Sequence, residues 1–293
     1  MKFTKMHGIG NDYVYVNCFE EEVKEPGKVS EFISDRHFGI GSDGLILICP
    51  SEKADCRMDM YNADGSRGKM CGNGIRCVGK YAYDHGLVPP DRRTITVETL
   101  AGIKTLELQV EDGKAVSLTV DMGKGELTSE LPEDILVEGV SLESAGSAEA
   151  PRDPEAGCLS FVGINVGNPH AVCFTKGIEK LDLEKIGPSF EFHERFQPER
   201  VNTEFIEVVD KGHLNMRVWE RGSGETWACG TGATASVMAA ILMGYAEDEA
   251  EVKLRGGCLK IRLDRVTGHL FMTGPATEVF SGSIDIPPEI YYD

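Results

Sequence analysis

The chain carries the same short loop twice, and this repeat constrains its fold more than any other feature. Residues 70–77 read Met-Cys-Gly-Asn-Gly-Ile-Arg-Cys, and residues 228–235 read Ala-Cys-Gly-Thr-Gly-Ala-Thr-Ala, so Cys229 follows Cys71 by 158 positions in one Cys-Gly-x-Gly frame. Glycines let backbone N–H groups turn towards a ligand, and a helix that starts there directs its positive dipole end at the same point. A thiol at such a place is one whose pKa can be lowered.

The segments around the two loops occur in the same order in both halves. Each half reads as strand, helix, strands, Cys-Gly-x-Gly loop, helix and strands, and the helices after the loops are predicted at 75–85 and 233–243. A repeat this long indicates duplication of a domain rather than a solenoid. We expect two similar α+β domains facing each other, with both cysteines at the interdomain cleft, where ligand sites are common. A further strand is predicted at 283–286, and residues 138–158 are expected to form a surface excursion.

Composition restricts the partners of the chain. With 293 residues and a net charge of −18, the protein lacks the basic surface that nucleic acid or an anionic membrane needs, although a few local arginines are enough for a small anionic substrate. No apolar run approaches the roughly 18 residues of a membrane span, and the N-terminus lacks the apolar core of a signal peptide. We therefore expect a cytoplasmic protein without nucleic-acid or membrane partners.

The nine cysteines show no Cys-x-x-Cys pair, so no zinc or thioredoxin-type site is predicted. In a reducing compartment most of them are expected to be small buried residues, and Cys77 is expected only to pack its helix. The Gly-rich run at 37–44 precedes a strand, whereas a dinucleotide-binding loop follows one. No metal or nucleotide cofactor is therefore expected.

Three uses of the paired cysteines differ in how much of the repeat they explain. A disulfide would be incidental in a reducing cytosol. A single cysteine nucleophile would need a histidine base and would leave the second loop unexplained. In the third use, one thiolate removes a proton from a carbon while the opposing thiol donates one to its other face. Only this two-base chemistry uses both loops, and helix N-termini would stabilise charge that develops on a nearby carboxylate.

The motifs in their order resemble the diaminopimelate epimerase family over essentially the whole chain. They are Lys5-Met6-His7-Gly8-Ile9-Gly10-Asn11-Asp12, Asn62-Ala63-Asp64-Gly65-Ser66, Cys71-Gly72-Asn73-Gly74 with Arg76-Cys77, Gly167-Asn168-Pro169-His170, Arg200-Val201-Asn202, and Glu220-Arg221-Gly222 running to Cys229-Gly230-Thr231-Gly232. The resemblance implies an α+β fold of two pseudo-symmetric domains, each a mostly antiparallel sheet or barrel wrapped around a central helix. The predicted domains are 1–124, joined by a C-terminal strand within 279–293, and 125–278.

The resemblance also implies an activity and a set of site residues. The activity is the cofactor-independent conversion of LL-2,6-diaminopimelate to the meso isomer, in lysine and peptidoglycan precursor biosynthesis, by a homodimer. Cys71 and Cys229 would be the two bases, and His170 and Glu220 would tune the thiols. The substrate would be bound by Asn11, Asn62, Gly72, Asn73, Asn168, Asn202, Glu220, Arg221, Gly230 and Thr231. Taken alone, His170 after Asn-Pro would more often be a turn histidine.

Two positions depart from the family pattern, and three other functions compete. Gly44 stands where some members have a substrate-contacting glutamine, and Phe280 where some have a tyrosine at a dimer interface. A proline racemase or hydroxyproline epimerase would share the fold and the cysteine pair but would not need Asn62, Asn202 and Arg221 to hold a second amino-acid centre. A phenazine-biosynthesis-type isomerase would lack the thiols, and a non-catalytic binding protein would exchange no protons.

Overall fold

The computed structural model describes residues 1–136 and 158–291, and contacts divide the chain into two compact units. One unit comprises Met1–Asp121 with Thr273–Asp293, and the other comprises Met122–Met272. The sequence placed boundaries after residues 124 and 278, a division that stays a prediction. The expected excursion at 138–158 lies outside the described residues except for Cys158, which begins a strand.

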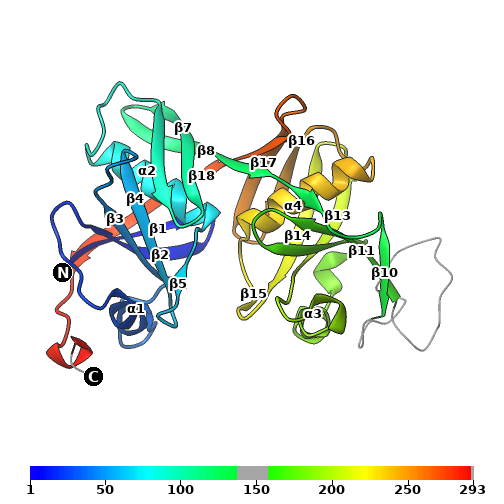
Figure 1. Cartoon of the computed structure of the whole chain (residues 1–293), viewed down its shortest axis with the longest axis horizontal. Helices are drawn as coiled ribbons and strands as arrows, with labels where there is room; N and C mark the ends of the chain where they lie inside the picture. Colours follow the sequence, from blue (N-terminus) through cyan, green and yellow to red (C-terminus); the bar gives the residue numbers. More distant parts are fainter. Residues whose placement is uncertain (137–157, 292–293) are drawn as a thin grey trace. The chain divides into compact units, whose positions relative to one another are not determined.

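The first unit is a sheet with one helix buried against it and one short helix beside it (Figure 1). Its strands lie in the order β19, β1, β2, β3, β4, β6, β7, β8, and all neighbours are antiparallel except the parallel pairs β2–β3 and β4–β6. The elements are β1 (Lys2–Gly8), β2 (Asn11–Asn17), α1 (Pro26–Ser34), β3 (Gly44–Cys49), β4 (Cys56–Asn62), β5 (Arg67–Gly68), α2 (Gly72–Asp84), β6 (Thr94–Thr99), β7 (Gly102–Glu111), β8 (Lys114–Lys124), β19 (Thr277–Ser283) and the 3₁₀ turn η3 (Pro288–Tyr291).

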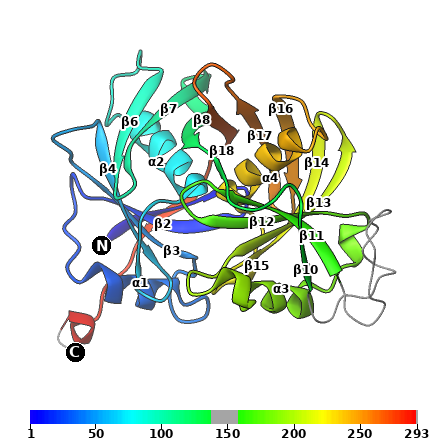
Figure 2. The ribbon, with the colours of Figure 1, turned by 45° about the vertical axis from the view of Figure 1, so that its right-hand side comes forward.

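The second unit repeats this plan around α4, as Figure 2 shows from a second angle. Strand β11 pairs with β9, β10 and β12, and the order continues through β13, β14, β16 and β17 with parallel pairs β12–β13 and β14–β16. The elements are β9 (Glu126–Leu127), β10 (Glu133–Leu136), β11 (Cys158–Asn165), β12 (Pro169–Phe174), η1 (Ile178–Lys180), α3 (Leu183–Glu191), η2 (Glu194–Phe196), β13 (Asn202–Asp210), β14 (His213–Glu220), β15 (Gly224–Glu225), α4 (Gly230–Leu242), β16 (Glu249–Leu254), β17 (Gly257–Leu263) and β18 (His269–Pro275).

The two central helices are buried along most of their length, which confirms the predicted fold class. In α2 only Lys80 and Asp84 escape burial, and these two form an ion pair of 2.8 Å between Nζ and Oδ2. Helix α4 is rich in alanine, a strong helix former that lets strands approach closely on all sides. Each helix ends before a glycine with φ +73, Gly86 or Gly244.

Both central helices begin three residues earlier than the sequence predicted, at Gly72 and Gly230. The glycines of the Cys-Gly-x-Gly frame therefore form the first helical turn instead of a loop before it. The cysteine supplies the reason, because its sulfur accepts a hydrogen bond from the N–H of the third helical residue, as an N-cap side chain does. Glycine frequency alone suggested a loop, since glycine disfavours helix interiors.

The last strand also differs from the prediction of residues 283–286. The observed strand is β19, which pairs with β1 and places Phe280 opposite Lys5. Hydrogen bonding to β1 extends this strand to the earlier residues, whereas 284–286 lie beyond it. None of the helices within 1–136 and 158–291 has the length and apolar content that a membrane span requires.

Candidate active site

Cys71 caps helix α2 and contacts Asn11, the first residue of β2. Its sulfur accepts a hydrogen bond from the Gly74 N–H at 3.3 Å and donates to Asn11 Oδ1 at 3.2 Å. Asn11 begins β2 and is oriented in turn by Asp43, whose Oδ2 accepts from Asn11 Nδ2 at 2.8 Å. Burial and the neighbouring Asp12 carboxylate raise the pKa of Asp43. The amide of Asn11 is thus held with its oxygen towards the thiol.

The other predicted residues of this half lie at the start of α2 and at the end of β4. Gly72 and Asn73 form the first turn of α2, and Asn73 is buried. Asn62 ends β4, where its Nδ2 donates to Ser66 Oγ at 3.0 Å. One turn further along α2, the fully buried Arg76 donates to the Gly72 carbonyl at 3.1 Å. Sequence reasoning named Arg76 as part of a motif and missed this supporting contact.

Cys229 occupies the equivalent place at the start of α4 and is buried. Its sulfur accepts from the Gly232 N–H at 3.4 Å, lies 3.5 Å from Thr231 Oγ1, and accepts from Asn202 Nδ2 at 4.0 Å. Gly230 is the first residue of the helix. The structure therefore brings together Cys229, Asn202, Gly230 and Thr231, four residues that the sequence singled out.

Two carboxylates surround the Cys229 thiol. Burial, followed by the charges of Glu220 and Glu204, raises the pKa of Cys229 well above its ordinary value. Burial also raises the pKa of Glu220, against the effect of its hydrogen bonds with Thr226 and Cys229. The Thr226 hydroxyl donates to Glu220 Oε1 at 2.5 Å. In this environment the neutral thiol of Cys229 is favoured over its thiolate.

His170 lies on β12 as part of a buried network, not in a solvated turn. Its Nδ1 is 2.7 Å from Glu204 Oε1, and its Nε2 is 3.1 Å from Asn168 Oδ1. The network explains how Asn168 is oriented. Glu204 is the residue that sequence reasoning missed. Its position two residues after Asn202 on one strand places both side chains on the same face, and an acidic residue there was the available signal.

Arg221 follows β14 and is connected to Asn202. Its backbone N–H donates to Asn202 Oδ1 at 3.0 Å, and its guanidinium donates to the Glu199 carbonyl. Asn202 is therefore held from one side by Arg221 and bonds Cys229 from the other. The Asn202 Oδ1 accepts the Arg221 N–H, and its Nδ2 donates to the Cys229 sulfur.

The two departures from the family pattern have different surroundings. A Cβ on Gly44 would lie 2.1 Å from the Tyr61 carbonyl oxygen, so this backbone has no room for a side chain. Phe280 is 48% exposed on β19 and contacts Phe3 edge-to-face at 5.9 Å between ring centroids.

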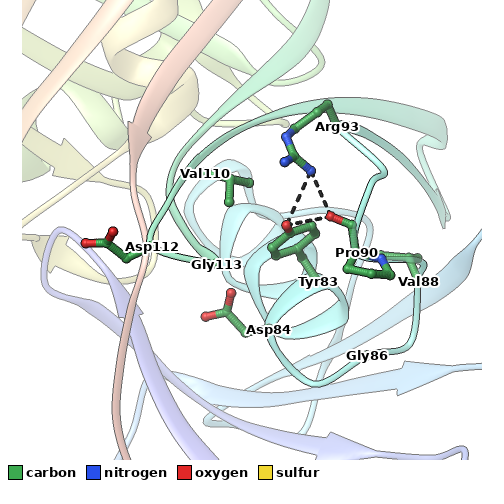
Figure 3. Close-up of a pocket in the computed structure, with 9 residues that line it drawn as sticks. All are labelled: Tyr83, Asp84, Gly86, Val88, Pro90, Arg93, Val110, Asp112 and Gly113. Carbon is green, nitrogen blue, oxygen red and sulfur yellow. Dashed lines mark hydrogen bonds between the residues drawn. The ribbon is translucent and has the colours of Figure 1, made fainter.

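A depression of about 670 Å³ in the first unit is unrelated to these residues (Figure 3). Arg93 and Tyr83 line it, and both bond the Pro90 carbonyl, at 2.9 Å and 2.8 Å. The side chains of Arg93 and Tyr83 are thus occupied by the Pro90 carbonyl, and the depression contains no predicted site residue. Within residues 1–136 and 158–291, no three His, Cys, Asp or Glu side chains are placed to hold a metal ion.

Comparisons with known proteins point to the same family as the sequence motifs. The family model described as diaminopimelate epimerase matches residues 3–128 and 162–279. Proteins named diaminopimelate epimerase from Agathobacter rectalis and Methanococcus maripaludis are 55% and 51% identical to the chain, each over 98% of this chain and 100% of the relative. Another from Acetivibrio thermocellus is 52% identical over 98% of this chain and 99% of the relative.

Solved structures share the fold at low identity. A predicted epimerase from Pseudomonas aeruginosa has a TM-score of 0.72 at 10% identity, covering 98% of this chain and 99% of that one. A probable proline racemase from Agrobacterium radiobacter has a TM-score of 0.68 at 15% identity, covering 98% and 93%. These likenesses establish the fold without separating the competing activities. The full-length relatives and the family model make that separation: the chain belongs to the diaminopimelate epimerase family.

Proposed function

We propose that this chain converts LL-2,6-diaminopimelate to the meso isomer by inverting one α-carbon, with two thiols and no cofactor. The observation that carries the proposal is the pair of cysteine-capped central helices, each with a sulfur bonded to an N–H of its own first turn. Inversion requires a proton to leave one face of the carbon and another to arrive at the opposite face. A duplicated domain supplies one thiol for each face.

This two-base reaction requires the two cysteines to differ in protonation at the start of a turnover, one as a thiolate and the other as a thiol. In one direction Cys71 first loses to solvent the proton that it donates to Asn11 Oδ1 in this structure, then removes the α-proton as a thiolate and becomes a thiol again, while Cys229 gives its proton to the other face and becomes a thiolate. The raised pKa of Cys229 supports its role as the acid in this direction. The reverse reaction exchanges the two roles, so the pair titrates as one coupled system.

The first turns of α2 and α4 would stabilise the negative charge that builds up on the α-carboxylate. The N–H groups of a first helical turn and the helix dipole both favour an anion. Gly72 with Asn73 and Gly230 with Thr231 occupy these turns. Electrostatic stabilisation of this kind is among the largest contributions an active site makes to a rate.

The remaining substrate would be held by side chains of both halves. Arg221 suits a carboxylate because its guanidinium offers two parallel donors, and Glu220 suits an ammonium. The amides of Asn11, Asn62, Asn168 and Asn202 would complete the binding site, and His170 with Glu220 would tune the thiols. The product would serve lysine and peptidoglycan precursor biosynthesis. We further propose a cytoplasmic homodimer, for which sedimentation of the purified protein at several concentrations is the test.

The activity is tested with LL-diaminopimelate in heavy water without added cofactor, followed by NMR. We expect deuterium at one α-carbon together with the meso isomer. Exchange with proline but none with LL-diaminopimelate would overturn the assignment in favour of a proline racemase. No exchange with either substrate would favour a binding protein.

The two-base mechanism is tested with Cys71→Ala and Cys229→Ala, each measured against Cys77→Ala. Cys77 is a matched control because it is a fully buried thiol in α2 whose pKa burial raises to about 11. Each site variant should lose full epimerisation by at least about 100-fold, since general acid or base catalysis contributes that much or more. Near-normal turnover in either variant would refute the mechanism.

A further inference from the structure

Glu204 places a carboxylate in the interior of the second unit beside the site residues. The side chains of Glu204 and His170 both have 0% exposure, and Glu204 Oε1 lies 2.7 Å from His170 Nδ1. Within the part of the chain that the structure describes, Glu204 Oε2 has no hydrogen-bond partner. Burying a carboxylate is costly unless an opposite charge compensates for it. The free-energy cost of burying the Glu204 carboxylate therefore needs a compensating interaction or a function.

The first unit provides an internal comparison for this position. A Cβ on Gly232 of α4 would meet Glu204 Oε1 at 2.5 Å and Met216 Cε at 3.0 Å. The equivalent Gly74 of α2 would meet Ile46 Cδ1 at 2.7 Å and Met58 Cε at 3.3 Å. The methionines correspond, and Ile46 stands where the other half has Glu204. A fold that accepts isoleucine here does not need the carboxylate for packing.

The hydrogen bonds of His170 indicate what the carboxylate does. Both ring nitrogens face oxygens, Nδ1 towards Glu204 and Nε2 towards Asn168 Oδ1 at 3.1 Å. A nitrogen that donates to an oxygen carries a proton, so a ring that makes both bonds is an imidazolium. The carboxylate of Glu204 supplies the compensating charge.

We propose that Glu204 is a positioning residue of this active site, which holds His170 as an imidazolium and through it fixes the Asn168 side chain with its Nδ2 donor towards the substrate. The inference rests on the proposed epimerase function. The carboxylates that act on the ring are Glu204 on β13 and Glu220 on β14, and both also act on the Cys229 thiol at the start of α4. The positive charge of His170 compensates one of the two carboxylates. When Cys229 becomes a thiolate during turnover, this part of the site therefore does not hold three uncompensated negative charges.

The test replaces the carboxylate in two ways and records the state of the ring directly. Glu204→Gln keeps the shape and removes the charge, and Glu204→Ile installs the residue of the first half. Glu249→Gln is the control, since Glu249 is an exposed carboxylate of the same unit paired with Lys260 at 2.6 Å. The side-chain nitrogen signals of His170, assigned by comparison with His170→Gln, are measured by NMR at pH 7.5 without substrate.

We expect doubly protonated His170 in the unaltered protein and in Glu249→Gln, and a neutral ring in Glu204→Gln. For Glu204→Gln and Glu204→Ile, kcat with LL-diaminopimelate should fall by about 10- to 100-fold, as for loss of groups that orient a site residue. A singly protonated ring in the unaltered protein overturns the inference even if a variant fails to fold. Equal kcat and unchanged ring signals in Glu204→Gln overturn it as well.

The outcome is separable from that of the proposed function. If the unaltered protein does not epimerise LL-diaminopimelate, the proposed function fails, and the ring signals still report whether Glu204 charges His170. If the unaltered protein is active but Glu204→Gln matches Glu249→Gln in kcat and in ring signals, only the further inference fails.

Discussion

The matched glycines Gly232 and Gly74 allow one prediction in which the structure sets the magnitude. At Gly232, an alanine Cβ would lie 2.5 Å from Glu204 Oε1 and 3.2 Å from Cys229 Sγ. The carboxylate cannot yield easily, because His170 holds the same oxygen. Overpacking at such a place costs about 3 kcal/mol, and alanine regains about 1 kcal/mol of helix propensity. We expect Gly232→Ala to lower the free energy of unfolding by about 2 kcal/mol.

Gly74→Ala is the matched variant, with a different expected result. There the new Cβ would meet the flexible end of Ile46 at 2.7 Å and Met58 at 3.3 Å. Apolar side-chain ends can shift, so a cost of about 1 kcal/mol roughly cancels the gain in helix propensity. The free energy of unfolding should therefore stay nearly unchanged.

Urea unfolding measures stability, and exchange of the α-proton of LL-diaminopimelate into heavy water measures activity. Gly232→Ala should reduce kcat by about 100-fold, because displacing a reacting group by about 1 Å costs that much. Gly74→Ala should reduce it less. In a Glu204→Ile background, the stability difference between the two glycine substitutions should disappear. Equal losses of stability and activity from Gly232→Ala and Gly74→Ala would refute the reasoning.

Two further predictions concern pH and the Gly44 departure. Burial raises the pKa of Cys77 from 9.0 to about 11, so the folded state binds the proton more tightly, and the stability this contributes is complete below pH 9 and is lost between pH 9 and 11. Urea unfolding at pH 8, 9 and 10 should show a decline that is shallower in Cys77→Ala by up to about 1.4 kcal/mol per pH unit; identical slopes would contradict this. Gly44→Ala should lower the free energy of unfolding by about 3 kcal/mol, because its Cβ would lie 2.1 Å from a backbone oxygen of the paired strand. Unchanged stability in the same assay would mean that β3 and β4 can separate at this position.

Much of the plan of this protein follows from local sequence. The repeated Cys-Gly-x-Gly frame and the order of strands around it predicted two α+β halves, each with a helix after the loop, because hydrophobic periodicity and glycine placement are local signals. The central position of each helix was implied by the family resemblance. The same frame identified Cys71 and Cys229, and the family resemblance implied Asn11 and Asn202 as substrate-binding residues; the structure shows that both asparagines contact the thiols. Helix starts were predicted less well, since a cysteine that caps its own helix is recognised only when its sulfur is seen to accept the N–H.

Tertiary structure decided the charges around Cys229 in the second unit. Glu204 and His170 are 34 positions apart in the chain, and no local pattern pairs them. Their contact depends on the parallel pairing of β12 with β13 and on the space that Gly232 leaves open. The pKa of Cys229 likewise depends on burial and on carboxylates from two other strands. Sequence by itself determined which groups the two halves carry, because motifs are local; the folded chain decided their charges, because burial and through-space neighbours are set only when distant strands pack together.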